Sequence, residues 1–202
     1  MKKLFTVAVF LLSTFALHAQ VGNFQIKGGV GISTFTGKDA KDLKAIPGWK
    51  LGLGCEYKVS DKFSIDPSLM FDAKGAKTKG DEYEKGETFH LDYLTLPVLA
   101  TWHITDQFHA GVGPYFSYGL CGTKDAFKKD GGNYSRFEAG IDVGASYSID
   151  KFNVGVDFTY GLTRAQRKID FEDEDEEGAS SSGSYTPKMN SLTVGVTLGY
   201  TL

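Results

Sequence analysis

The stretch "NVGVDFTYGL", residues 153–162, alternates apolar and polar residues without a break. One parity holds Val154, Val156, Phe158, Tyr160 and Leu162, and the other holds Asn153, Gly155, Asp157, Thr159 and Gly161. Strict alternation predicts a β-strand whose two faces meet different surroundings. In a soluble sheet the apolar face would cover a core and the polar face would meet water. The fold class therefore depends on which of the two faces lies inside the protein.

Seven further segments of the chain repeat this alternation. They are residues 24–33, 49–59, 63–73, 88–104, 108–120, 136–149 and 191–202. Short polar connections at 60–62, 105–107 and 150–151 alternate along the chain with long charged ones at 36–47, 74–87, 122–134 and 164–188. Transmembrane barrels have an even number of antiparallel strands, with short turns at one end and long loops at the other. The order predicts an all-β fold, an eight-stranded antiparallel up-and-down transmembrane β-barrel.

Glycine placement indicates which face is the inside. The polar parity carries Gly52, Gly54, Gly111, Gly113, Gly140, Gly144, Gly155, Gly161, Gly195 and Gly199. Glycine weakens a strand unless the backbone curves sharply or large neighbours need room. An eight-stranded barrel supplies both reasons, because its interior is just wide enough to be filled by side chains. A soluble sandwich or lipocalin-like barrel would instead have Lys, Glu and Thr on that face. We therefore expect the polar parity to face inward and the apolar parity to face lipid.

Aromatic residues on the apolar parity gather in two bands. At the short-turn ends of the segments they are Phe24, Tyr57, Phe63, Trp102, Phe108, Tyr147, Phe152 and Tyr200. At the long-loop ends they are Trp49, Phe71, Phe89, Phe116, Tyr118, Phe137 and Tyr160. Two aromatic girdles around an aliphatic band are typical of residues at the two membrane–water interfaces.

The chain begins "MKKLFTVAVFLLSTFALHAQ", with two lysines, an apolar run over residues 4–12 and a small-residue exit. This layout predicts a secretory signal peptide over residues 1–19, cleaved between Ala19 and Gln20. A membrane anchor is the alternative, but a spanning helix needs about 20 apolar residues. Residues 20–202 then form one barrel domain, as expected for a chain of 202 residues. The net charge of −3 gives no electrostatic basis for binding nucleic acid.

Several of these segments together resemble a known family. "YLTLPVLATW" (93–102), "AGVGPYFSYGL" (110–120) and "EAGIDVGASYSI" (138–149), followed by "VDFTYGL" (156–162), look like the PorT-like outer-membrane β-barrel domain of Gram-negative bacteria. The resemblance covers essentially the whole mature chain and implies an eight-stranded outer-membrane barrel. It implies little about activity, because a few such barrels are linked to protein secretion and many are uncharacterised. Such barrels usually end in Phe; here the last residue is Leu202, which leaves Tyr200 as the aromatic element of the assembly signal.

Two sets of residues are candidates for chemistry in the barrel. His90 and Asp92 share a parity at the long-loop end, where some barrels carry a lipid-modifying Ser/His/acid site. Acyl transfer also needs an identifiable nucleophile, so we interpret His90 as part of a polar rim. The second set is the inward-facing charge: Lys27, Lys50, Lys58, Lys74, Arg136, Glu56, Asp66, Asp72, Glu138, Asp142 and Asp157. In so narrow a barrel these side chains are expected to pair into a closed polar plug instead of lining a channel.

Three local features give further expectations. The acidic segment "DFEDEDEEGASSSGS", residues 170–184, could collect Ca²⁺ or Mg²⁺, but it lacks the ligand spacing of a calcium loop. A block of like charges predicts an unstructured, solvated loop around Glu172. In the segment 88–104, Phe89, Leu91 and Tyr93 are expected to face lipid on the odd parity, and the residues from Leu94 to Trp102 on the even parity. This change predicts a β-bulge near Tyr93 and Leu94 that switches the faces. Cys55 and Cys121 fall at opposite ends of their strands, so we expect no disulfide between them.

The sequence therefore predicts a non-enzymatic outer-membrane barrel with a structural or partner-binding role, with no catalytic, cofactor or metal site. The expected partners are outer-membrane lipid and a cell-envelope or secretion-system protein, with the barrel itself monomeric and no nucleic acid bound. Two alternatives stay open. One is an outer-leaflet lipid-modifying enzyme that uses His90, and the other is a narrow pore or carrier.

Overall fold

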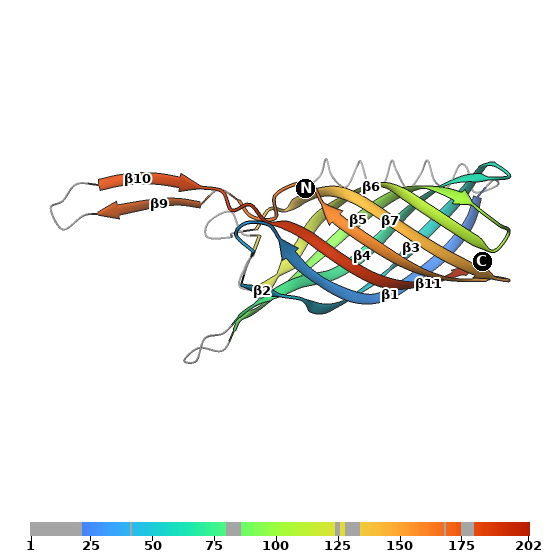
Figure 1. Cartoon of the computed structure of the whole chain (residues 1–202), viewed down its shortest axis with the longest axis horizontal. Coiled ribbons are helices and arrows are strands. Elements are labelled where there is room, and N and C mark those ends of the chain that lie inside the picture. The colour runs from blue at the N-terminus through green and yellow to red at the C-terminus, as the bar shows by residue number, and fades with distance from the viewer. Residues whose placement is uncertain are drawn as a thin grey trace.

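The computed structural model describes residues 22–40, 42–79, 86–123, 126–127, 134–167, 169–174 and 180–202. Eight long strands make one closed antiparallel barrel (Figure 1). They are β1 (Gly22–Thr36), β3 (Ile46–Ser60), β4 (Phe63–Thr78), β5 (Thr88–His103), β6 (Phe108–Gly122), β7 (Phe137–Ile149), β8 (Phe152–Gly161) and β11 (Asn190–Thr201). Each strand pairs with its neighbours in the chain, β1 pairs with β11, and the pairing of β4 with β5 completes the ring. The predicted eight-stranded barrel is confirmed, while the predicted signal peptide lies outside the described residues.

The two ends of the barrel differ in the length of their connections. At the short-turn end, β7 and β8 are joined by Asp150 and Lys151 alone. Asp150 has a φ of 54°, in the left-handed region that Asp tolerates better than most residues and that tight hairpins require. The long-loop end carries the two-residue strand β2 (Leu43–Lys44) and the strands β9 (Ile169–Glu174) and β10 (Ser180–Tyr185).

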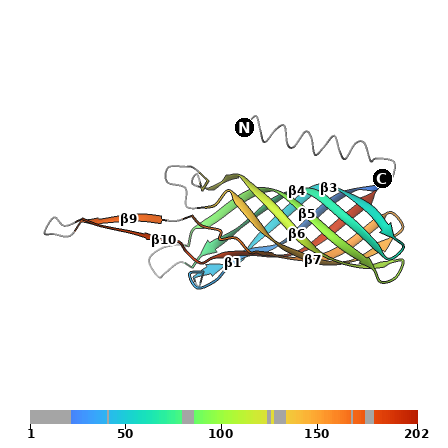
Figure 2. The same cartoon turned by 90° about the horizontal axis from the view of Figure 1, so that it is seen from above.

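Strands β9 and β10 pair with each other as a separate two-stranded sheet. This hairpin extends well beyond the long-loop end of the barrel (Figures 1 and 2). The expectation of an unstructured loop over residues 170–184 is therefore wrong for its described parts. The register explains why the acids do not prevent pairing, because Glu174 lies opposite Ser180 and Glu172 lies opposite Ser182. Like charges directly opposite each other would oppose pairing, whereas acid opposite serine does not.

The apolar parity faces outward, as the alternation predicts. In β8 the exposed side chains include Val154, Val156 and Phe158, while Gly161 of the other parity is buried. Interior glycines leave room for large neighbours. A Cβ atom at Gly140 would come within 2.5 Å of the ring of Tyr115. The predicted inside and outside of the barrel are confirmed along most of its wall.

The lumen is apolar at the long-loop end. There a buried cluster, the apolar cap, comprises Phe35, Ala40, Ala76, Leu91, Tyr93, Ala126, Phe127, Tyr134, Ala165 and Met189. Leu91 and Tyr93 of β5 point into this cap with exposures of 0% and 1%. Phe89, on the same parity, contacts Tyr134, with the two rings tilted by 46° and their centroids 6.2 Å apart. The expectation that these three residues face lipid is wrong, because it assumed a polar interior along the whole barrel.

The predicted bulge near Tyr93 is present, but its extra residue belongs to β6. The β5–β6 register shifts between Asp92, which lies opposite Cys121, and Tyr93, which lies opposite Gly119. Leu120 is thus the inserted residue, while β5 pairs with β4 without a shift. The faces of β5 do not switch, and the bulge instead turns Cys121 outward.

Both cysteine thiols are free, as expected. Cys55 lies toward the short-turn end of β3 and is buried, and Cys121 lies at the long-loop end of β6 and is exposed. Among the described residues no helix is long and apolar enough to cross a membrane.

The inward orientation of Leu91 generates a testable prediction. Leu91→Ala should lower the free energy of unfolding by about 2–5 kcal/mol, because it leaves a cavity inside the cap. Leu94→Ala, the matched control on the outer face, should cost less, because acyl chains can fill the space. Denaturant-induced unfolding from lipid vesicles measures both. A larger loss for Leu94→Ala would mean that the faces of β5 do switch.

Candidate functional site

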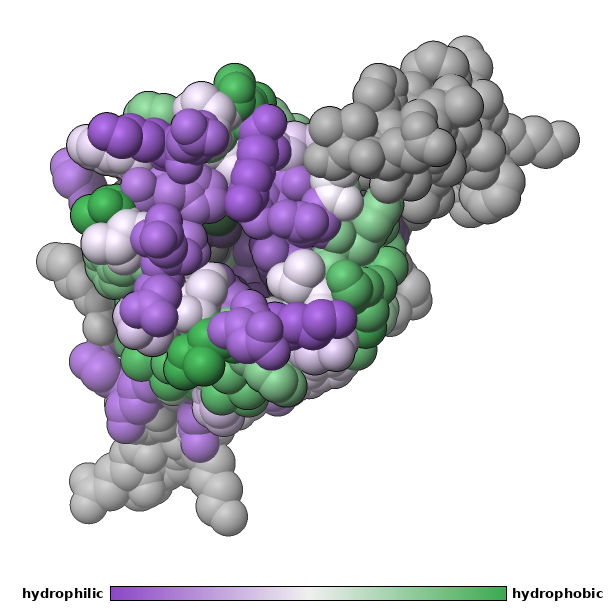
Figure 3. Space-filling model, turned by 90° about the vertical axis from the view of Figure 1, so that its right-hand side faces the viewer, coloured by the Kyte–Doolittle hydropathy of each residue, from purple (hydrophilic) through white to green (hydrophobic). Residues whose placement is uncertain are grey.

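The half of the lumen nearer the short-turn end contains a cavity of about 180 Å³. Looking onto this end, Figure 3 shows a polar rim around a central hollow. Charged side chains from several strands line the cavity, among them Lys27, Lys50, Asp66, Asp142 and Asp157. The lumen is thus divided along its axis into a polar, hollow half and the packed apolar cap.

One ion pair in the cavity joins two strands that are not neighbours in the barrel. Lys50 Nζ of β3 lies 2.5 Å from Asp157 Oδ2 of β8, and the Thr197 hydroxyl donates to the other oxygen of Asp157 at 2.6 Å. A third inward charge, Lys27, donates to the Ser68 hydroxyl at 2.9 Å. The expected pairing of inward charges is confirmed for Lys50 and Asp157.

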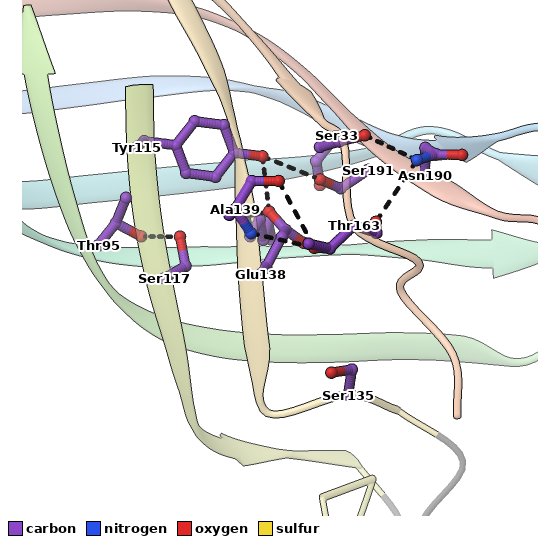
Figure 4. Close-up of polar contacts among 12 residues, drawn as sticks. Ser33, Thr95, Tyr115, Ser117, Ser135, Glu138, Ala139, Thr163, Asn190 and Ser191 are labelled. Carbon is purple, nitrogen blue, oxygen red and sulfur yellow. Dashed lines mark hydrogen bonds and ion pairs between the residues drawn. The ribbon is translucent and has the colours of Figure 1, made fainter. Parts of the chain in front are cut away.

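A second, more deeply buried network separates the cavity from the apolar cap. Lys74 Nζ lies 2.7 Å from Glu138 Oε1. The same oxygen accepts a hydrogen bond from the Tyr115 hydroxyl at 2.7 Å (Figure 4). Lys74 Nζ also lies 4.5 Å from the centre of the Tyr93 ring, within cation–π range. Tyr115 and Glu138 are 1% and 2% exposed. Side chains this buried fill the lumen at this level and form the inner end of the cavity.

Two histidines stand at the short-turn rim of the cavity. His103 Nε2 lies 3.3 Å from Glu56 Oε1 and 3.0 Å from the Ser64 hydroxyl. His109 Nε2 bonds to the Ser148 hydroxyl at 3.0 Å, and the two rings lie edge to face with centroids 4.5 Å apart. These contacts give the cavity a polar entrance.

Two members of the predicted inward charge set lie elsewhere. Lys58 is exposed near the turn between β3 and β4. Arg136 donates to the main-chain carbonyls of Phe127 and Gly119 at the long-loop end. Its expected role in the luminal plug is therefore wrong, because Arg136 precedes the first residue of β7 and its guanidinium bonds to main-chain carbonyls at the long-loop end.

The candidate acyl-transfer pair at the long-loop end is not assembled as a triad. His90 is exposed, and its main-chain N–H donates to the Thr123 hydroxyl at 3.1 Å. The carboxylate of Asp92 accepts a hydrogen bond from the Cys121 thiol at 3.1 Å. Sequence reasoning missed this contact, since only the Leu120 bulge turns Cys121 onto the outer face. It also missed the role of Tyr115, whose only sequence signal was an aromatic residue on the polar parity, and that of Tyr93, which was expected to face lipid.

The acidic hairpin is attached at its base to the first long loop. The main-chain N–H of Lys188 donates to Asp39 Oδ2 at 2.7 Å. The Tyr185 hydroxyl also bonds to this carboxylate and, with the Lys188 N–H, lowers the pKa of Asp39. Within the described part of the chain, no group of three or more His, Cys, Asp or Glu side chains is arranged to hold a metal ion.

Comparisons with solved structures find barrels of the same kind. Neisserial surface protein A shares 10% identity with this chain, with a TM-score of 0.56 over 89% of this chain and 97% of that one. The attachment invasion locus protein of Yersinia pestis, solved with the heparin analogue sucrose octasulfate, shares 14% identity, with a TM-score of 0.45 over 90% and 99%. OprG of Pseudomonas aeruginosa shares 15%, with a TM-score of 0.43 over 89% and 96%. At these identities the likeness concerns the fold alone.

No curated protein matches the chain. A family match, however, covers residues 18–165, well over half of the sequence, and its description is outer membrane protein beta-barrel domain. Together with a closed eight-stranded barrel that turns its apolar parity outward, this match identifies the chain as a member of the outer membrane protein beta-barrel domain family, located in the outer membrane.

Proposed function

We propose that this protein is a non-enzymatic, single-chain outer-membrane barrel that binds an envelope or surface partner through the β9–β10 hairpin. The main support for this proposal is the position of the hairpin, which extends away from the barrel at its long-loop end (Figure 1). Long loops of outer-membrane barrels are extracellular, so the hairpin stands outside the cell. The PorT-like resemblance of the sequence suggests a secretion or surface-attachment system as the setting of this partner.

The hairpin offers two means of recognition. Within the described residues neither β9 nor β10 pairs with a third strand, so each keeps one unpaired edge. Such edges accept an added strand from a binding partner. Seven of the eight residues from 170 to 177 are acidic, which favours a basic partner segment. The contacts of Asp39 with Tyr185 and Lys188 hold the hairpin at its base and reduce the entropy lost on binding.

The packed lumen argues against the pore alternative. Leu91, Tyr93, Tyr115 and Glu138 are each 2% exposed or less and come from three strands of the wall. The bonding of Asp92 to Cys121 argues against the enzyme alternative, because the acid that would orient His90 has another partner. A partner-binding role accounts for the projecting hairpin and its acidic residues, which neither a pore nor a lipid-modifying enzyme would explain.

The first of three predictions from the proposed function concerns partner binding. Glu172→Gln, Asp173→Asn and Glu174→Gln together should abolish enrichment of an envelope protein that co-purifies with the parent from its native outer membrane. The reason is the loss of charge complementarity with a basic segment. Quantitative mass spectrometry after cross-linking measures the enrichment. The control variant Asp61→Asn and Asp106→Asn, with acids removed at the short-turn end, should keep it. Equal enrichment in all three proteins would refute the binding role of the hairpin.

The second prediction separates the hairpin from the barrel wall. Deleting residues 172–182 should leave the barrel assembled, because loop closure changes by only about 0.6 kcal/mol per doubling of loop length. Asp157→Leu should destabilise the barrel, by less than the roughly 3–5 kcal/mol typical of breaking a fully buried pair, since it leaves the half-buried Lys50 without its partner. Heat-modifiable migration on a denaturing gel, with a denaturant titration, reports both. Loss of the folded band in the deletion would make the hairpin part of the fold.

The third prediction addresses the two alternatives. The parent should show no sustained conductance in planar bilayers, because buried side chains pack the lumen. His90→Ala should leave the acyl pattern of lipopolysaccharide in the native cell unchanged. Regular channel openings would favour the pore, and an altered acyl pattern that wild-type protein restores would favour the enzyme.

A further inference from the structure

The cavity at the short-turn end contains a carboxylate that the fold does not satisfy. Asp142 of β7 is 8% exposed, and its Oδ1 atom is buried without a hydrogen-bond partner. Its register partners on the two adjacent strands are Gly113 of β6, which has no side chain, and Thr159 of β8. Within the described ranges no Lys or Arg nitrogen lies within 4.0 Å of this carboxylate. Buried polar atoms are almost always bonded, so an unpartnered carboxylate oxygen that faces a cavity marks a place where a hydrogen-bond donor can bind.

The balance of charge in the cavity identifies the sign of that group. Five carboxylates line it, from Glu56, Asp66, Asp72, Asp142 and Asp157, against three lysines. Lys74 is committed to Glu138, which lies outside the cavity lining, and Lys50 is committed to Asp157. Lys27 is then the one lysine left to balance the four carboxylates other than Asp157. The cavity lining is therefore acidic, and a positively charged ligand would neutralise it.

We infer that this cavity binds a small organic cation with N–H donors, of the class of protonated primary amines, which enters from the periplasm. The short-turn end is the periplasmic end of such barrels, and there the cavity meets the polar rim of Figure 3. An ammonium group carries three donors, which suits a carboxylate oxygen that lacks one. His109 at the entrance offers a second buried nitrogen without a partner, its Nδ1. The described residues provide no metal-binding cluster, which favours an amine over a divalent ion.

The size of the cavity limits the ligand. A volume of about 180 Å³ accommodates a short amine or several water molecules but not a folded chain segment. On its far side the ligand would meet the Lys74–Glu138–Tyr115 network, which closes the way to the cell surface. The site is thus a dead-end pocket that communicates with the periplasm.

The test uses the full-length mature barrel, ¹⁵N-labelled in lipid nanodiscs, with methylammonium chloride as the probe. The main-chain amide resonances of Gly113 and Thr159 should shift saturably as methylammonium is added. Tetramethylammonium at the same ionic strength should not produce this shift, because it has the charge but no N–H donor. Asp142→Asn should raise the dissociation constant for methylammonium at least tenfold, while Asp61→Asn at an exposed turn should leave it unchanged.

A second measurement separates a binding role from a structural one. Since Asp142 has no fixed cationic partner, Asp142→Asn should unfold at the same or a higher denaturant concentration than the parent. A lower midpoint for Asp142→Asn would assign Asp142 to the fold and overturn the inference. So would linear shifts in the parent, equal shifts with tetramethylammonium, or a dissociation constant that Asp142→Asn does not change. The parent titration with its two probes decides the point even if the variant fails to fold.

Discussion

A strand that crosses the hydrocarbon core of a membrane has no water for its main-chain N–H and C=O groups. Each unsatisfied group there costs several kcal/mol, so strands can cross only as a closed barrel. In this protein the pairing of β1 with β11 and of β4 with β5 removes both open edges. Closing eight strands fixes a narrow interior, and that interior has to be filled by the side chains of one parity. The side chains of the apolar parity then face lipid, where their exposure carries no free-energy penalty.

The interior is filled in two different ways along the axis. At the long-loop end apolar and aromatic side chains pack as in a soluble core, with Leu91 fully buried. Toward the short-turn end charged side chains pair across the lumen, as Lys50 does with Asp157. A buried ion pair offers little net stability compared with apolar packing of the same volume. The polar half is therefore not what stability alone would select, and its hollow form is consistent with a binding role.

Alternation and turn lengths predicted the strands and their topology because both depend on local chemistry and on the membrane. The parity rule failed for β5, where Leu91 and Tyr93 are apolar and yet face inward. No local pattern tells an apolar residue facing lipid from one facing an apolar lumen, since both are dry. Likewise, the contact between Cys121 and Asp92 depends on a single inserted residue, Leu120, whose position in the register only the paired strands define. The sequence predicted which charged residues face the lumen as a set, but it could not assign their partners, because the barrel geometry decides which side chains meet.

The two halves of the lumen meet at side chains that are themselves half polar. Tyr93 presents its ring to Lys74, and Tyr115 donates its hydroxyl to Glu138. Tyrosine suits this level because it has an apolar ring that can pack in the cap, as that of Tyr93 does, and a hydroxyl that can bond to the charged layer, as that of Tyr115 does. Lys74 thus contacts the faces of two tyrosine rings, and Glu138 Oε1 accepts hydrogen bonds from both Lys74 and the Tyr115 hydroxyl. Since this layer is packed and buried, it separates the cavity at the short-turn end from the hairpin at the long-loop end by a closed section of barrel.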